Sequence, residues 1–101
     1  MTNEKVLSVV DAYAARLDAD GFEPVRLEIS DAIDASDVGA ALHHVRWMCD
    51  EIKKFLADNR SEKAARWFGF IQGTLWLAGY YTIEELMFQN KPPEEPSKPA
   101  A

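Results

Sequence analysis

The sequence predicts an all-α protein in which an antiparallel helical hairpin and an N-terminal helix form a three-helix bundle. A short C-terminal fourth helix and a disordered tail follow the bundle. Three observations support this fold class: long stretches with apolar residues three and four apart, residues between them that end and begin helices, and no pair of segments that could form a sheet. We expect a single helical domain over residues 1–90 and a disordered Pro-rich tail over residues 91–101.

Composition limits the class of protein. A chain of 101 residues with 48% hydrophobic residues is long enough for one domain with a modest core. The single Cys49 cannot form an intrachain disulfide, and no signal segment is evident, so we expect a cytoplasmic setting. The net charge is −6, and residues 1–36, with three basic and eight acidic residues, contribute −5 of it. An acidic chain lacks the basic surface that binds phosphate backbones, which argues against nucleic-acid binding.

The first helix is expected to begin after Thr2 or Asn3, either of which can cap it, and to run to about Asp20. Gly21 can take the left-handed conformation that ends a helix, and Phe22 can then fold back on the last turn. The apolar residues of this helix fall on one face at helical spacing: Leu7, Val10, Ala14 and Leu17. An amphipathic helix is therefore predicted.

The segment 23–36 has a mixed pattern. Val25, Leu27 and Ile29 alternate as in a strand, whereas Ile29 and Ile33 also fit one face of a helix. A strand needs a partner for its backbone groups, and the sequence offers no second strand. We expect an extended loop followed by at most a turn or two of helix.

The next helix is expected over 37–58, with Asp37 or Ser36 as its cap. Its buried face repeats at alternating three and four residues: Leu42, Val45, Cys49, Ile52 and Leu56. On the opposite face Arg46 and Asp50 can pair at i,i+4. Asn59 is a candidate for the left-handed residue that ends this helix. The next helix is expected to begin almost at once, and so short a connection makes the two helices antiparallel neighbours.

The third helix is predicted from Ser61, as its cap, to about Ala78. Because nearly every residue from 64 to 81 is apolar or small, we expect the other helices to enclose it. Ala65, Gly69 and Gly73 form a small-residue ridge at four-residue spacing, predicted to be a packing site for another backbone. If so, replacing either glycine by Leu should overpack the bundle and cost about 1 to 3 kcal/mol.

A sharp corner is expected after this helix. Gly79 can end it, and Tyr80 can fold back on Leu75 as in a Schellman motif. Thr82 can cap the fourth helix, with Glu85 three residues on as its capping-box partner. The prolines at 92 and 93 end that helix near residue 90.

No catalytic or metal signature stands out. His43 and His44 lie near Cys49 and Asp50, but helical metal ligands need i,i+3 or i,i+4 spacing, which these histidines lack. Cys49 falls on the apolar face of its helix and is expected to be a core residue. We therefore predict no enzyme, no cofactor and no metal, with an unrecognised site near His43, His44 and Asp50 as an open alternative.

Trp47 is the residue best placed to mark an interaction surface. It falls on the polar side of its helix near His43 and Lys54, where an indole would not be expected. A membrane span is not expected, because Arg66 and Gln72 interrupt an apolar run of 18 residues that is already short for a bilayer. The corner at 79–86 resembles a helix-turn-helix entry, but its second helix is acidic.

Several motifs resemble those of small helical proteins encoded in bacteriophages and prophages, which have no established activity. They are HVRWMC at 44–49, RWFGFIQG at 66–73, LW at 75–76, TIEEL at 82–86, and Asn90, within a region covering about half of the chain. The resemblance implies a phage-type accessory protein and lends no catalytic residues. The N-terminal third shows no such resemblance.

The function expected from these observations is that of a noncatalytic accessory protein that acts through an unidentified protein partner and forms a homodimer. The alternative is a small regulator of nucleic-acid transactions. The second alternative is an enzyme with the site near the two histidines.

Overall fold

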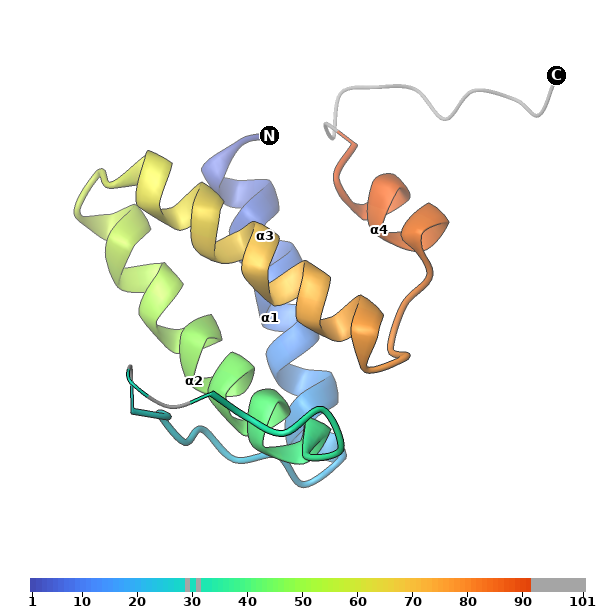
Figure 1. Ribbon diagram of the computed structural model, residues 1–101. Coiled ribbons are helices and arrows are strands. Elements are labelled where there is room, and N and C mark those ends of the chain that lie inside the picture. Colours follow the sequence, from blue (N-terminus) through green and yellow to red (C-terminus); the bar gives the residue numbers. More distant parts are fainter. Residues whose placement is uncertain (29, 31, 92–101) are drawn as a thin grey trace, which may run out of the picture.

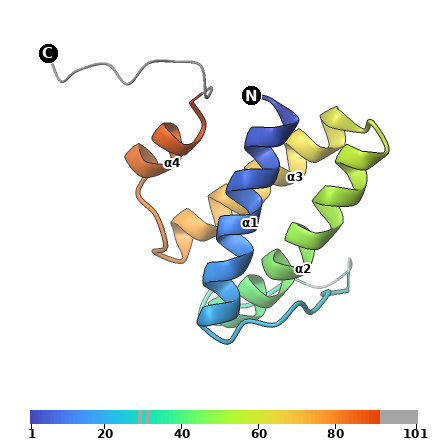
Figure 2. The same cartoon turned by 180° about the vertical axis from the view of Figure 1, so that it is seen from behind.

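The computed structural model describes residues 1–28, 30 and 32–91, and within them the chain forms four α-helices and no strand. The helices are α1 (Asn3–Ala19), α2 (Val38–Ala57), α3 (Ser61–Leu77) and α4 (Ile83–Gln89). The chain reverses between α2 and α3, which form the hairpin, and α1 lies across one face of this hairpin (Figures 1 and 2). The predicted all-α fold is confirmed. Apart from Lys91, the predicted tail lies outside the described residues.

Three helices end in the same way, each with one residue at positive φ. Gly21, Asn59 and Gly79 have φ of 85°, 58° and 81°. After each one, the next N–H donates to the carbonyl five residues back: Phe22 to Leu17, Arg60 to Phe55, and Tyr80 to Leu75, at 2.9, 2.8 and 2.9 Å. These are the Schellman bonds expected at a left-handed helix terminus. All three predicted helix ends are confirmed.

The N-caps of α1, α2 and α4 are the predicted residues, and the N-cap of α3 is not. Thr2 and Asp37 accept the N–H groups of Lys5 and Ala40, and Thr82 forms a complete capping box with Glu85. The prediction that Ser61 caps α3 is wrong. The cap is Arg60, which makes no side-chain cap bond. Its N–H closes the end of α2 and its carbonyl accepts the first bond of α3, from Ala64, so one residue serves both helices and Ser61 is already helical.

The core lies between α1, α2 and α3. Its largest fully buried residues come from all three helices: Val10, Tyr13, Leu17, Val45, Cys49, Ile52, Ile71 and Leu75. Cys49 is among them, as predicted, and burial raises the pKa of its thiol to about 12. A neutral, buried thiol is a packing group and not a nucleophile at ordinary pH.

The segment before α2 is extended, as expected, and α2 provides the partners that a sheet would otherwise supply. The N–H of Val25 donates to the carbonyl of His43, and the N–H of Leu27 donates to His44 Nδ1 at 3.0 Å. His43 Nδ1 in turn donates to the carbonyl of Glu23 at 2.7 Å, since a carbonyl can only accept. The two adjacent histidines therefore fasten this segment to the first turns of α2.

The prediction that α3 is enclosed by the other helices is wrong. Its buried residues lie on one side only: Ala64, Phe68, Ile71, Gln72 and Leu75. The small-residue ridge of Ala65, Gly69 and Gly73 is exposed, and a Cβ built on either glycine meets nothing within 4 Å. The inner side buries Phe68, Ile71 and Leu75 against α1 and α2, which removes their apolar surface from water. The ridge is consequently not a packing site within this chain.

Candidate interaction surface

Large apolar side chains gather on the outer side of α3 and on α4. We call this surface the α3–α4 face; it consists of Phe70, Trp76 and Leu77 of α3 and Ile83 and Met87 of α4, around Gly69 and Gly73. The five large side chains are exposed by 57%, 48%, 75%, 57% and 66%. Burial of such side chains is the main source of folding free energy, so five of them left in water on two neighbouring helices need an explanation.

The residues from α3 lie on one continuous strip. Phe70, Gly73 and Leu77 follow the i, i+3, i+7 spacing that places residues on one side of a helix. Gly69, Gly73 and Trp76 follow the i, i+4, i+7 spacing of the same side. The two glycines therefore form a low centre between an aromatic ring on one flank and another on the opposite flank.

A polar network holds α4 beside this strip. Gln72 Nε2 donates to Asn90 Oδ1 at 2.7 Å, and Asn90 Nδ2 donates to Gln72 Oε1 at 3.0 Å. Gln72 also donates to the hydroxyl of Tyr13, which donates to Gln89 Oε1. Burial raises the pKa of Tyr13 to about 12, so this hydroxyl keeps its proton. No residue of α4 is buried, and the network is the polar part of what fixes its position.

The same network makes the surfaces of α3 and α4 adjacent. Gln72 is three residues after Gly69 and four before Trp76, so it borders the exposed strip of α3. Asn90 is on the same side of α4 as Ile83 and Met87, at i+7 and i+3. The Gln72–Asn90 amide pair thus joins the edge of one apolar strip to the edge of the other, and Figure 1 shows α4 alongside the C-terminal half of α3.

The α3–α4 face is about as large as the largest apolar patch on a typical monomer. An aromatic side chain has roughly 150 to 250 Å² to bury, so the half-exposed Phe70 and Trp76 leave on the order of 100 Å² each in water. Leu77, Ile83 and Met87 are smaller, and the five side chains together expose on the order of 400 Å². Standard protein–protein interfaces bury about 800 Å² per partner. The glycines and the polar rim can supply the remainder.

The other border of the face is a groove of ≈ 450 Å³ between α3, α2 and the extended segment. Phe70, Thr74 and Leu77 form its α3 wall, and Ala41 and His44 its α2 wall. His44 is partly buried here, and its pKa is lowered by burial and by the nearby Arg26. The neutral ring is the form that can accept the Leu27 N–H.

The surface predicted from the sequence is arranged differently. Trp47 is half-buried against α3, with its ring 5.7 Å from that of Trp67 and the guanidinium of Arg26 over its face. His43 packs edge-on against another ring, that of Phe22, and Lys54 pairs with Glu51 at 2.8 Å on the surface. Trp47, His43 and Lys54 thus take part in three separate local contacts. The indole on the polar side of α2 is accounted for by aromatic packing within the chain.

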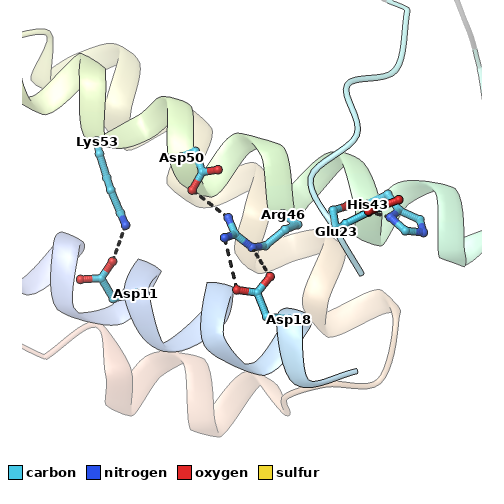
Figure 3. A network of polar contacts seen from close by, with 7 residues as sticks. All are labelled: Asp11, Asp18, Glu23, His43, Arg46, Asp50 and Lys53. Carbon is cyan, nitrogen blue, oxygen red and sulfur yellow. Dashed lines mark hydrogen bonds and ion pairs between the residues drawn. The ribbon is translucent and has the colours of Figure 1, made fainter. Parts of the chain in front are cut away.

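The residues of the alternative enzyme site are likewise engaged in separate contacts. Arg46 makes two bonds to Asp18, at 2.7 and 3.3 Å, and one to Asp50 at 2.8 Å (Figure 3). The predicted Arg46–Asp50 pair is confirmed, and Arg46 lowers the pKa of Asp18. Together with Lys53 and Asp11, 2.6 Å apart, these groups join α2 to α1. Asp50 is therefore part of a helix–helix contact, while His43 and His44 hold the extended segment.

Among residues 1–28, 30 and 32–91, no three or more His, Cys, Asp or Glu side chains are grouped to hold a metal ion. Within the same part of the chain, no helix has the length and apolar character needed to cross a bilayer. Comparison of the chain with protein-family models, with curated proteins and with solved structures finds no match in any of the three. The α3–α4 face is therefore the feature from which a function can be inferred.

Proposed function

We propose that this protein is a noncatalytic accessory protein that works by protein–protein interaction, and that it forms a homodimer through the α3–α4 face. The phage and prophage context is what the sequence resemblance implies, and it forms part of the proposal. The observation that carries the proposal is the exposed apolar strip on α3, whose Phe70, Trp76 and Leu77 surround two glycines.

The glycines support an interface and not merely an exposed surface. A glycine inside a helix costs roughly 1 kcal/mol relative to alanine, and within the monomer Gly69 and Gly73 gain nothing in return, because their surroundings are open. In a dimer they would let a second backbone approach closely, which offsets this cost.

A second copy of the chain is the partner that the surface favours first. Homo-oligomers with a two-fold axis are the most common soluble assemblies, and they need a surface that complements itself. The α3–α4 face combines protruding rings with a flat centre, so it can both insert and receive side chains. Its five large side chains and two glycines carry no charge, which limits the repulsion that a net charge of −6 on each chain would otherwise cause.

A pair of matched substitutions tests the proposal. Phe70→Asp places a carboxylate in the α3–α4 face, whereas Phe88→Asp does so at a phenylalanine of similar exposure, 67%, on the other side of α4. Light scattering at high micromolar concentration should give dimers for the parent protein and for Phe88→Asp, and monomers for Phe70→Asp. Both variants should keep the parent's far-UV circular dichroism. A monomeric parent protein would refute the homodimer.

A further inference from the structure

We infer that protonation of His44 releases Leu27 from α2, and that the neighbouring His43 keeps its contact with the extended segment when this happens. The two histidines then form a fastening that opens at one point as the pH falls. The inference does not depend on the proposed homodimer. It comes from the opposite hydrogen-bonding roles of two adjacent imidazole rings.

The ring of His44 accepts a hydrogen bond through Nδ1. The donor is the backbone N–H of Leu27, at 3.0 Å, and a backbone N–H can only donate. Nδ1 of His44 must therefore carry a lone pair, and the neutral ring holds its single proton on Nε2. Protonation of this ring places an N–H on Nδ1 as well, so that two donors face each other and the bond to Leu27 is lost.

The ring of His43 uses the same atom in the opposite role. Its Nδ1 lies 2.7 Å from the carbonyl oxygen of Glu23, which can only accept, so this nitrogen carries the proton. A second proton enters the ring at Nε2 and leaves the bond to Glu23 in place. The carbonyl of His43 also accepts the N–H of Val25 at 3.1 Å, and no titration of the ring removes that bond. Residues 23–25 therefore stay fastened in both protonation states.

The charges that the extended segment brings to His44 have opposite signs. Burial first, and then the positive charge of Arg26, lower the pKa of His44. Glu28 lines the same groove as His44 and attracts a protonated ring, but its side chain is exposed and water screens the attraction. The residues that α3 contributes to this groove are uncharged: Phe70, Thr74 and Leu77. Protonation of His44 thus sets a second positive charge near Arg26.

The indole of Trp47 does not alter this balance. Its ring centre lies 5.3 Å from that of His44, and a cation beside an indole is stabilised. Both residues belong to α2, so their contact is the same whether the extended segment is fastened or released. The guanidinium of Arg26 also lies over Trp47, at 5.3 Å from the ring centre, and this contact moves with the segment.

Release of Leu27 changes the groove that borders the α3–α4 face. Leu27 and Glu28 line this groove together with Phe70 and Leu77 of α3. When Leu27 moves away from α2, the groove widens and more of its apolar wall meets water. The fastening thereby couples pH to the apolar surface beside the α3–α4 face.

The direction and steepness of the pH dependence follow from linkage. In the released state His44 regains its ordinary pKa of 6.5, whereas the bond to Leu27 keeps the ring neutral in the fastened state. The ratio of released to fastened chains is therefore constant above pH 6.5. Below it, this ratio rises by about tenfold for each pH unit until the ring is protonated in the fastened state as well.

NMR spectroscopy of the full chain between about pH 7.5 and pH 5 tests the inference. At the higher pH, the ring-nitrogen shifts should place the proton of His44 on Nε2 and that of His43 on Nδ1. As the pH falls, the amide proton of Leu27 should move upfield and its heteronuclear NOE should drop. The amide of Val25 and the far-UV circular dichroism should not change over the same range.

The adjacent histidines supply a matched pair of variants. In His44→Asn, a side-chain oxygen that does not titrate takes the place of Nδ1, so Leu27 should stay fastened at pH 5. In His43→Asn, a side-chain amide can still donate to Glu23, and Leu27 should respond to pH as in the parent protein.

Three results would overturn the inference. They are a proton on Nδ1 of His44 at pH 7.5, a response of Leu27 that persists in His44→Asn, and a loss of helical circular dichroism by pH 5, which would mean general unfolding. The ring-proton measurement uses the parent protein, so it decides the matter even where a variant folds poorly.

Discussion

Both sides of α3 carry large apolar residues, yet they have different surroundings. The inner side places Ile71 and Leu75 in a core shared with α1 and α2, where both are fully buried. The outer side places Phe70 and Leu77 in water, around glycines that meet nothing. Hydrophobicity alone therefore does not indicate whether the chain itself covers a helix face. The inner side determines the fold, and the outer side is the surface that we propose for association.

The largest expected effect is the difference in stability between substitutions on the two sides of α3. Ile71→Ala should lower the free energy of unfolding by about 2 to 5 kcal/mol, because it leaves a cavity in the core. Leu77→Ala should change it by no more than about 0.5 kcal/mol when the protein is monomeric. Urea titrations at low protein concentration measure both values. Equal losses at the two positions would mean that the outer side is buried within the chain.

Disruption of the polar network that joins α3 to α4 should have the next largest effect. Gln72→Leu keeps the volume but removes the bonds to Asn90 and to the buried hydroxyl of Tyr13, so we expect a loss of roughly 1 to 3 kcal/mol. Hydrogen exchange should also become faster in residues 83–90 than in α1 to α3, because α4 buries no residue of its own. Unchanged exchange in α4 would show that apolar contacts, and not the network, hold this helix.

Two glycine substitutions should have opposite signs. Gly79 has φ of 81°, so Gly79→Ala should destabilise the monomer by about 1 to 2 kcal/mol. Gly73 is helical and its surroundings are open, so Gly73→Ala should stabilise the monomer by roughly 0.5 to 1 kcal/mol. Thermal melts of dilute protein give both values. Gly73→Ala should at the same time weaken the dimer, and a Gly73→Ala dimer as strong as the parent's would remove the glycines from the interface.

The smallest effect concerns pH at the border of the α3–α4 face. The pKa of His44 is lowered in the folded chain, first by burial and then by Arg26, so the unfolded chain binds the proton more readily. Stability is therefore unaffected above the ordinary pKa of 6.5 and falls as the pH drops below it. Urea midpoints between about pH 7.5 and pH 5 should decline more in the parent protein than in His44→Gln. Equal slopes would contradict the role of the neutral ring.

The sequence predicts the elements of this fold well because their signals are local. The left-handed residues at Gly21, Asn59 and Gly79 and the capping box at Thr82 and Glu85 each depend on a few neighbouring residues. Such a local signal was misleading at Ser61, because Arg60 just before it both closes the end of α2 and begins α3.

The candidate surface could not be predicted in the same way. A helix that is apolar all round indicates that both sides are covered, but it does not indicate by which chain. The position of Trp47 on its helix predicts an exposed indole, yet the ring that packs against it, that of Trp67, lies on another helix. The sequence of α3 does contain one signal of this surface. Its glycines fall on the side opposite Phe68 and Leu75, and α1 and α2 cover only the side of Phe68 and Leu75.

The most direct test of the central claim is the mass of the unmodified protein in solution, measured by sedimentation equilibrium from low to high micromolar concentration. One chain has a mass of 11.4 kDa. The outer side of α3 as a self-association surface predicts a mass that rises with concentration to that of two chains. A mass that stays at one chain throughout would contradict the account.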